Sequence, residues 1–98
     1  MEQLATLIET AGMTDAERVW AVIDAAWERL ENMIDPIVLH WQDTDEFEVV
    51  PRPHLTDVSW SERDREYEIW MQLDGDTLLE IRDAREAGQG PELIRAWA

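Results

Sequence analysis

Apolar residues near the N-terminus recur with the spacing of an amphipathic helix. The i, i+3, i+4, i+7 pattern predicts a short helix over residues 2–11, carried by Leu4, Leu7, Ile8 and Ala11. A second helix should begin after Thr14, because Thr14-x-x-Glu17 forms a capping box. We expect it to run to about Asp35, where Pro36 ends it. Its apolar face is expected to comprise Ala16, Trp20, Ile23, Trp27, Leu30 and Ile34, with Val19 and Met33 on its flank.

The pattern becomes extended from residue 37 onward. Residues 37–41 and 47–50 are rich in β-branched and aromatic side chains, and the polar run 42–46 between them indicates a hairpin. Pro51 and Pro53 place the second run at a sheet edge or end it. A short irregular strand is expected over residues 55–60.

The clearest alternation of apolar and polar positions lies in residues 65–73. Period two favours a strand there over a helix, although Ser61-x-x-Asp64 could cap a helix: Tyr67, Ile69, Met71 and Leu73 alternate with Glu66, Glu68, Trp70 and Gln72. The run 74–76 is read as a three-residue turn, which would put Ile69 opposite Ile81 and begin a partner strand at Thr77. Residues 84–90 are then expected to form a loop or a single helical turn. The main alternative is that 77–87 is a helix.

The order of these elements predicts a single α+β domain spanning residues 1–98. Two N-terminal helices come first, followed by a small antiparallel β-sheet of about four strands. A short helix over residues 92–97 ends the chain, with Pro91 at its first position. No stretch approaches the roughly 18 apolar residues that a membrane-spanning helix needs.

The charge balance restricts the classes of partner. The chain has 23 acidic residues against 8 basic ones, all of them arginine, for a net charge of −15. Such a protein should repel nucleic acid and membrane surfaces and attract basic protein surfaces. Hydrophobic residues make up 45% of the chain and include six tryptophans, so a folded core is expected despite the charge.

The absence of cysteine and the sequence of the N-terminus indicate the cellular compartment to expect. With no cysteine in the sequence, disulfides and Cys-rich zinc sites are excluded. The start, Met1-Glu2-Gln3-Leu4, lacks the basic and apolar regions of a signal peptide. We therefore expect a cytoplasmic protein, in the host cytoplasm if it is phage-encoded.

Carboxylates form a stripe on the second predicted helix. On a helical wheel they fall within about 60° of one another and extend over roughly 27 Å: Glu17, Asp24, Glu28, Glu31 and Asp35. Like charges at i, i+4 cost about 0.2–0.5 kcal/mol per pair, which applies to Asp24–Glu28 and Glu31–Asp35. A stripe that weakens its own helix suggests a use in binding, whereas the simpler interpretation is a solvated face.

The predicted sheet adds further candidates for a binding surface. Alternate strand residues lie roughly 6.7 Å apart, which resembles the separation of successive phosphates along a DNA strand. Carboxylates at this spacing are Glu46 and Glu48 on one strand, and Asp64, Glu66 and Glu68 on another. Trp70 falls on the polar face of the second strand and could anchor an interface, unless the last helix covers it.

The motifs of enzymes are missing. There is no glycine-rich phosphate loop and no calcium-binding loop. Glu28-x-x-Glu31 resembles half of the helical metal motif of nucleotide pyrophosphohydrolases, but the only counterpart, Glu80 to Asp83, is too distant. Carboxylates near His40 and His54 are expected by chance on so acidic a surface. We therefore expect no catalytic activity, no cofactor and no metal site.

The leading hypothesis is a small acidic inhibitor or adaptor, monomeric or homodimeric, that docks on a basic protein surface. Small size, acidity and absence of cysteine give the chain a profile that resembles DNA-mimic proteins, including phage-encoded anti-CRISPR and anti-restriction proteins. That resemblance implies a target such as the DNA-binding groove of a nuclease or surveillance complex. The alternatives are an antitoxin or immunity-type protein that neutralises a basic toxin, and a protein whose acidity reflects adaptation to high salt.

Overall fold

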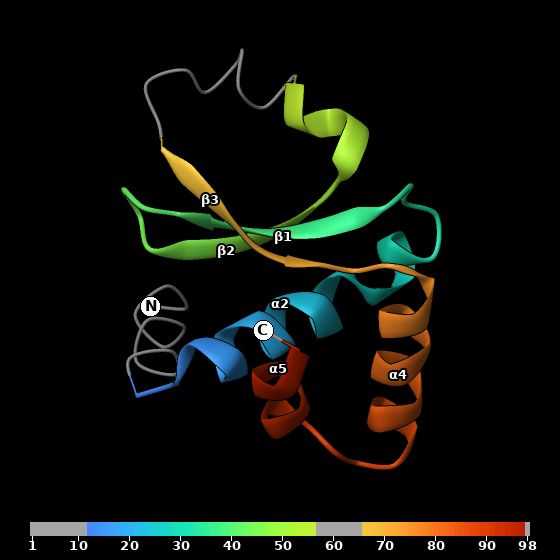
Figure 1. Ribbon diagram of the computed structural model, residues 1–98. Coiled ribbons are helices and arrows are strands. Elements are labelled where there is room, and N and C mark those ends of the chain that lie inside the picture. Colours follow the sequence, from blue (N-terminus) through green and yellow to red (C-terminus); the bar gives the residue numbers. More distant parts are fainter. Residues whose placement is uncertain (1–11, 57–65, 98) are drawn as a thin grey trace.

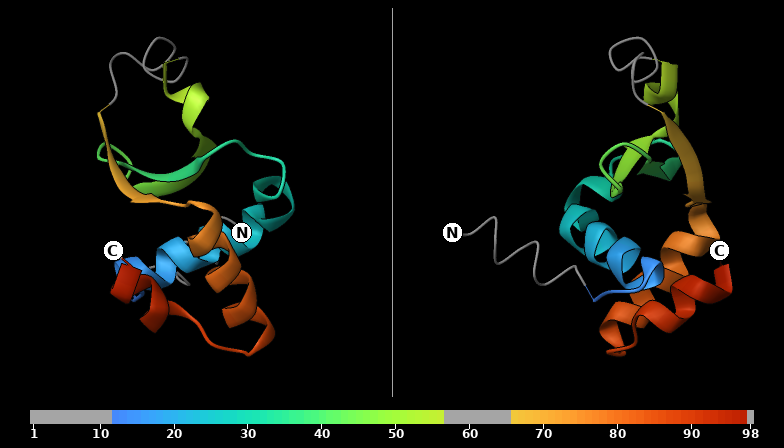
Figure 2. Two further views of the ribbon diagram at one scale, coloured as in Figure 1. Left: turned by 45° about the vertical axis from the view of Figure 1, so that its right-hand side comes forward. Right: turned by 90° about the vertical axis from the view of Figure 1, so that its left-hand side faces the viewer.

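The computed structural model describes residues 12–56 and 66–97, which form an α+β arrangement of three helices and a three-stranded antiparallel sheet, with a short 3₁₀ helix. Helices α2, α4 and α5 lie on one side of the sheet and η1 lies on the other (Figure 1). Two further views show the same separation (Figure 2). In chain order the elements are α2 (Asp15–Leu30), β1 (Pro36–Trp41), β2 (Glu46–Pro51), η1 (Arg52–His54), β3 (Tyr67–Gln72), α4 (Gly75–Glu86) and α5 (Pro91–Trp97).

Two sequence predictions fall wholly or partly outside the described residues. The helix over 2–11 lies outside them, as do residues 57–60 of the irregular strand. The first two residues of that strand, Leu55 and Thr56, are helical and not extended, so the strand prediction is wrong for them.

Helix α2 begins where the capping box predicts. The Glu17 backbone N–H donates to the Thr14 hydroxyl at 3.2 Å, and the Glu17 carboxylate accepts from the Thr14 backbone N–H at 3.0 Å. The helix ends at Leu30, five residues before the predicted end. Asp35, just before Pro36, adopts the left-handed conformation with φ of 45°, and this bend lets β1 begin at Pro36.

The buried face of α2 differs from the predicted one. Its buried residues are Ala16, Val19, Ile23, Ala26 and Leu30. Trp20 and Trp27 are only partly buried and pack against the margin of the core. Ile34 is 67% exposed, because the helix has ended before it.

The sheet has strand order β2-β1-β3. The predicted hairpin is confirmed: β1 and β2 are antiparallel, with Leu39 opposite Glu48. Strand β3 pairs with the other side of β1, and the register shifts so that Val38 faces Met71 while Leu39 faces Ile69. Trp70 is thus left without a β1 partner, as in a β-bulge.

The bulge overturns the single apolar face predicted for β3. Tyr67 packs with a cluster on the η1 side of the sheet, whereas Met71 and Leu73 belong to the core beneath the helices. Ile69 is 45% exposed. Trp70 is partly buried and packs edge-on against Phe47, with ring centroids 5.7 Å apart, so it is not the freely exposed anchor that strict alternation suggested.

Residues 77–87 do not form the predicted fourth strand; the helical alternative is confirmed. Asp74 caps α4 and is not a turn residue, because its carboxylate accepts from the Thr77 backbone N–H at 2.8 Å. Ile81 and Ala84, three positions apart, are the buried residues of this helix. The final helix is confirmed and begins at Pro91, with Ile94 fully buried.

Apolar side chains are buried on both faces of the sheet. The helix side holds the larger core, which includes Ile23, Leu30, Val38 and Ile81. The other side holds a smaller cluster of Ile37, Leu39, Trp41 and Val50, with Leu55 and Tyr67 packed against it.

Replacing Asp74 tests the helical assignment of residues 75–86. Asp74→Ala removes the N-cap acceptor and should lower the free energy of unfolding by about 1 kcal/mol, measured by urea denaturation. Asp76→Ala is the matched control, because it removes a nearby carboxylate inside the first turn and gains helix propensity. Equal losses in both variants would contradict the capping role.

Candidate binding surface between helices α2 and α4

The flanks of α2 and α4 line a depression in the surface of the molecule. One part has a volume of about 550 Å³ and is lined by Trp20, Asp24, Trp27, Glu31, Arg82, Arg85, Glu86, Gly88 and Gln89. The adjoining part, of about 310 Å³, is lined by Trp27, Leu30, Glu31, Gly75, Leu78, Leu79 and Arg82. Both parts share Trp27, Glu31 and Arg82, and together we call them the α2–α4 groove.

The packing of α2 explains why this surface is open. Helix α2 packs most closely against α5 and β2, and less closely against α4. Because its buried face is centred on Val19, Ile23 and Ala26, the indoles of Trp20 and Trp27 lie on the flank that lines the groove. The tryptophans that the sequence assigned to the core therefore form part of a partly exposed aromatic wall.

Arg85 joins the two walls of the groove. Its Nε lies 2.7 Å from an Asp24 carboxylate oxygen, and its guanidinium carbon lies 5.1 Å from the centroid of the Trp27 ring. The Arg85 side chain is one-third exposed, so solvent weakens the ion pair. The contact nevertheless shows the chemistry of this wall: a carboxylate and an aromatic face hold one guanidinium group.

The carboxylate stripe predicted on α2 is only partly realised. Glu17 belongs to the capping box, which lowers the pKa of its carboxyl through hydrogen bonds from Thr14. Asp24 is paired with Arg85, and Asp35 lies beyond the helix. Glu28 and Glu31 are exposed, and neither side chain makes an ion pair with any of the residues that the structure describes. The predicted continuous row is thus reduced to this pair.

Helix α4 contributes a row of carboxylates that the sequence analysis missed. Asp76, Glu80 and Asp83 are exposed and lie on one helix face, at i, i+4 and i+7. Glu86 lines the groove from the same helix. In a strand these three side chains would not share one face, so the row exists only because residues 75–86 are helical. The signals for a helix were the Asp74-x-x-Thr77 cap and the spacing of Ile81 and Ala84.

The carboxylates predicted on the sheet lie elsewhere. Glu46 and Glu48 are exposed on β2, and Glu48 accepts a hydrogen bond of 2.8 Å from the Trp41 indole. Glu66 precedes β3 and Glu68 lies on it, at the opposite edge of the sheet from β2. None of these four lines the α2–α4 groove. Asp64 lies outside the described residues.

Trp70 lies on the side of the sheet that packs against the helices. It lines a separate depression together with Thr77 and Trp97. The last helix therefore lies close to Trp70, in line with the alternative that this helix covers it. Trp70 therefore belongs to the margin of the core and does not adjoin the α2–α4 groove.

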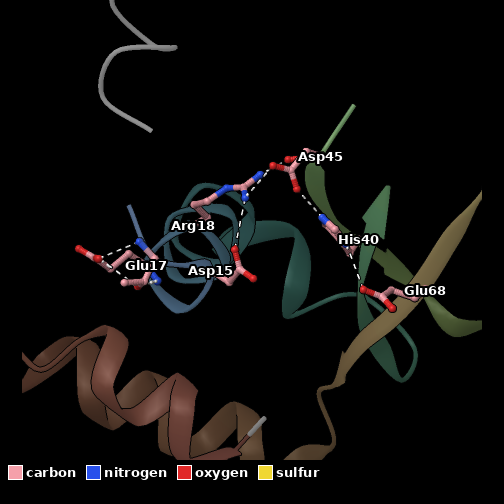
Figure 3. Close-up of polar contacts among 7 residues, drawn as sticks. Asp15, Glu17, Arg18, His40, Asp45 and Glu68 are labelled. Carbon is pink, nitrogen blue, oxygen red and sulfur yellow. Dashed lines mark hydrogen bonds and ion pairs between the residues drawn. The ribbon is translucent and has the colours of Figure 1, made fainter. Parts of the chain in front are cut away.

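His40, on the central strand β1 and close to the hairpin turn, lies between two carboxylates (Figure 3). Its Nε2 is 2.6 Å from an Asp45 oxygen, and its Nδ1 is 3.1 Å from a Glu68 oxygen. The hydrogen bond to Asp45 is the main cause that raises the pKa of His40, with Glu68 adding to it and burial opposing it. The carboxylates that the sequence analysis expected near His40 are therefore in direct contact with it, one from the hairpin turn and one from β3.

Arg18 connects this histidine cluster to α2 (Figure 3). Its guanidinium lies 3.2 Å from the Asp45 carboxylate and 3.4 Å from that of Asp15, and it also donates to the Asp45 backbone carbonyl. The hydrogen bond with His40, followed by the charge of Arg18, lowers the pKa of Asp45. The cluster therefore ties the turn between β1 and β2 to both α2 and β3.

No group of three or more His, Asp or Glu side chains is placed to hold a metal ion in the part of the chain that the structure describes. Over residues 12–56 and 66–97, no helix combines the length and apolar character required to cross a membrane. Comparisons with protein-family models, with curated proteins and with solved structures give no match to the chain.

The His40 cluster predicts a dependence of stability on pH. Because the folded-state pKa of His40 is raised above the ordinary 6.5, its contribution is full below that value and is lost as the pH rises through the folded pKa. Urea denaturation of wild type and His40→Gln should therefore differ most at mildly acidic pH and least at alkaline pH. A difference that stays constant across this range would contradict protonation of His40 as its source.

Proposed function

We propose that this protein is a small acidic inhibitor or adaptor that binds a basic surface of another protein through helices α2 and α4. The observation that carries the proposal is the set of exposed carboxylates on these helices. Glu28, Glu31, Glu80 and Glu86 make no ion pair with the residues that the structure describes. Such groups keep their charge available for cations of a partner.

The spacing of these groups supports a narrower proposal, that the partner normally binds DNA. Successive carboxylates on α4 advance by about 4.5–6 Å along the helix axis, from three to four residues at about 1.5 Å each. That step is of the same order as the phosphate spacing of a DNA strand, whose phosphates advance by about 3.4 Å along the axis and lie farther apart along the winding backbone. We propose that the protein acts as a DNA mimic of the anti-restriction or anti-CRISPR kind and blocks the DNA-binding groove of its target.

Capture of a partner from a cell lysate at low salt tests this function. The variant Glu28→Gln/Glu31→Gln should lose most of the captured basic protein, and duplex DNA should compete with the wild type for it. Glu46→Gln/Glu48→Gln is the matched control, because it removes two exposed charges from a strand remote from the groove. Equal capture by wild type and the first variant, or equal loss in both variants, would contradict a role for α2.

Salt dependence separates binding from adaptation to high salt. A binding protein of this kind should be folded at ordinary ionic strength and should release its partner as salt rises, because salt screens the charges that attract it. Circular dichroism at low salt and in molar KCl measures the first property. Folding only in molar KCl would indicate that the carboxylates are an adaptation to high salt and would contradict the proposed binding function.

A further inference from the structure

We propose that the α2–α4 groove receives a protein segment that carries an apolar side chain next to arginine. The apolar side chain enters between Trp27 and the leucines of α4, and the arginine pairs with carboxylates at the rim. This inference rests on the function proposed above and names the chemistry of the partner. It requires an apolar floor, free acceptors for a guanidinium group, and room for a segment of chain.

The apolar floor lies in the smaller part of the groove. Trp27 and Leu30 line it from α2, and Leu78 and Leu79 line it from α4. Leu79 is 50% exposed, because the buried face of its helix is formed by Ile81 and Ala84. A volume of about 310 Å³ is within the range of pockets that hold a ligand group. An apolar side chain placed there would remove both Leu79 and Trp27 from water.

Arg85 indicates which cation fits the wall beside this floor. Its guanidinium already lies against the Trp27 ring and the Asp24 carboxylate, as described above. Planar guanidinium groups stack on aromatic rings and pair with carboxylates in this way, whereas the more strongly hydrated ammonium of lysine does so less readily. Glu31 and Glu86 line the same part of the groove, and no residue in the described ranges forms an ion pair with either. A second guanidinium group would therefore find acceptors there.

The size and charge of the groove favour a protein segment as occupant. The larger part alone measures about 550 Å³ and joins the apolar part at Trp27, so several side chains fit along it. The net charge of −15 repels nucleic acid and attracts a basic chain. An amphipathic helix laid between two helices, with its apolar face inward and its arginines at the rim, matches this arrangement.

A pair of synthetic peptides tests the proposal. The first is a labelled amphipathic helical peptide with leucines on one face and arginines on its margins; the second has alanine in place of each leucine and the same charge. Fluorescence anisotropy at low salt measures the binding of each. We expect the leucine peptide to bind the wild type about tenfold or more tightly than the alanine peptide, because one buried leucine side chain contributes roughly that factor or more.

Two matched variants locate the binding. Leu79→Ser should weaken binding of the leucine peptide about tenfold, whereas Ile69→Ser, at a similarly exposed apolar residue on β3, should leave it unchanged. Urea denaturation of both variants verifies that they remain folded. Equal binding of the two peptides, no binding of either, or equal effects of the two substitutions would overturn the proposal. Capture of a basic protein that depends on Glu28 and Glu31 would still support the function proposed above, so the two failures are distinguishable.

Discussion

Burial of apolar side chains on both faces of the three-stranded sheet holds this protein together, because its charges cannot. The chain carries 23 acidic residues and only 8 arginines, so most carboxylates have no cation to pair with. The central strand β1 therefore sends Val38 into the core beneath the helices and Ile37 and Leu39 into the opposite cluster. No polar or charged side chain is buried among the described residues, and the carboxylates stay in water, where their repulsion is weakest.

Two arginines form ion pairs between separate elements of the fold. Arg18 joins α2 to the turn between β1 and β2 through Asp45, and Arg85 joins α4 to α2 through Asp24. Each also lies against an aromatic ring, Phe47 for Arg18 and Trp27 for Arg85. His40 adds a third cation, dependent on pH, between the hairpin turn and β3. These contacts position elements locally and leave Glu28 and Glu31 of α2, and Glu80 and Glu86 of α4, without an ion pair among the described residues.

Short-range signals in the sequence predicted the elements they control. The Thr14–Glu17 capping box, the hairpin of residues 37–50 and the Pro91 helix are all confirmed. The errors come from long-range packing. The bulge at Trp70 arises from pairing between β3 and β1. The end of α2 depends on the position of the sheet, because β1 begins at Pro36. Thr77, Leu79 and Ile81 also satisfy period two, so the Asp74 cap and the burial of Ile81 together with Ala84 are what distinguish a helix from a strand here.

The same error limited prediction of the candidate binding surface. The acids of α2 were identified from the sequence, but Asp76, Glu80 and Asp83 share a face only if residues 75–86 are helical. The groove also requires Trp20 and Trp27 to lie on the flank of α2, and this rotation of the helix is fixed by its contacts with α5 and β2. The hydrophobic pattern of one helix does not specify how that helix is rotated against its neighbours. The proposed function therefore depends on a surface that two helices form together.

Nuclear magnetic resonance tests most directly whether this surface binds the partner. The indole N–H signals report on separate parts of the molecule: Trp20 and Trp27 line the groove, whereas Trp41 is buried on the η1 side of the sheet. Titration with the arginine- and leucine-bearing peptide should shift the Trp20 and Trp27 signals and the backbone amides of α4, and leave Trp41 unchanged. Shifts confined to β2 and the Trp41 indole would show that the basic partner binds elsewhere.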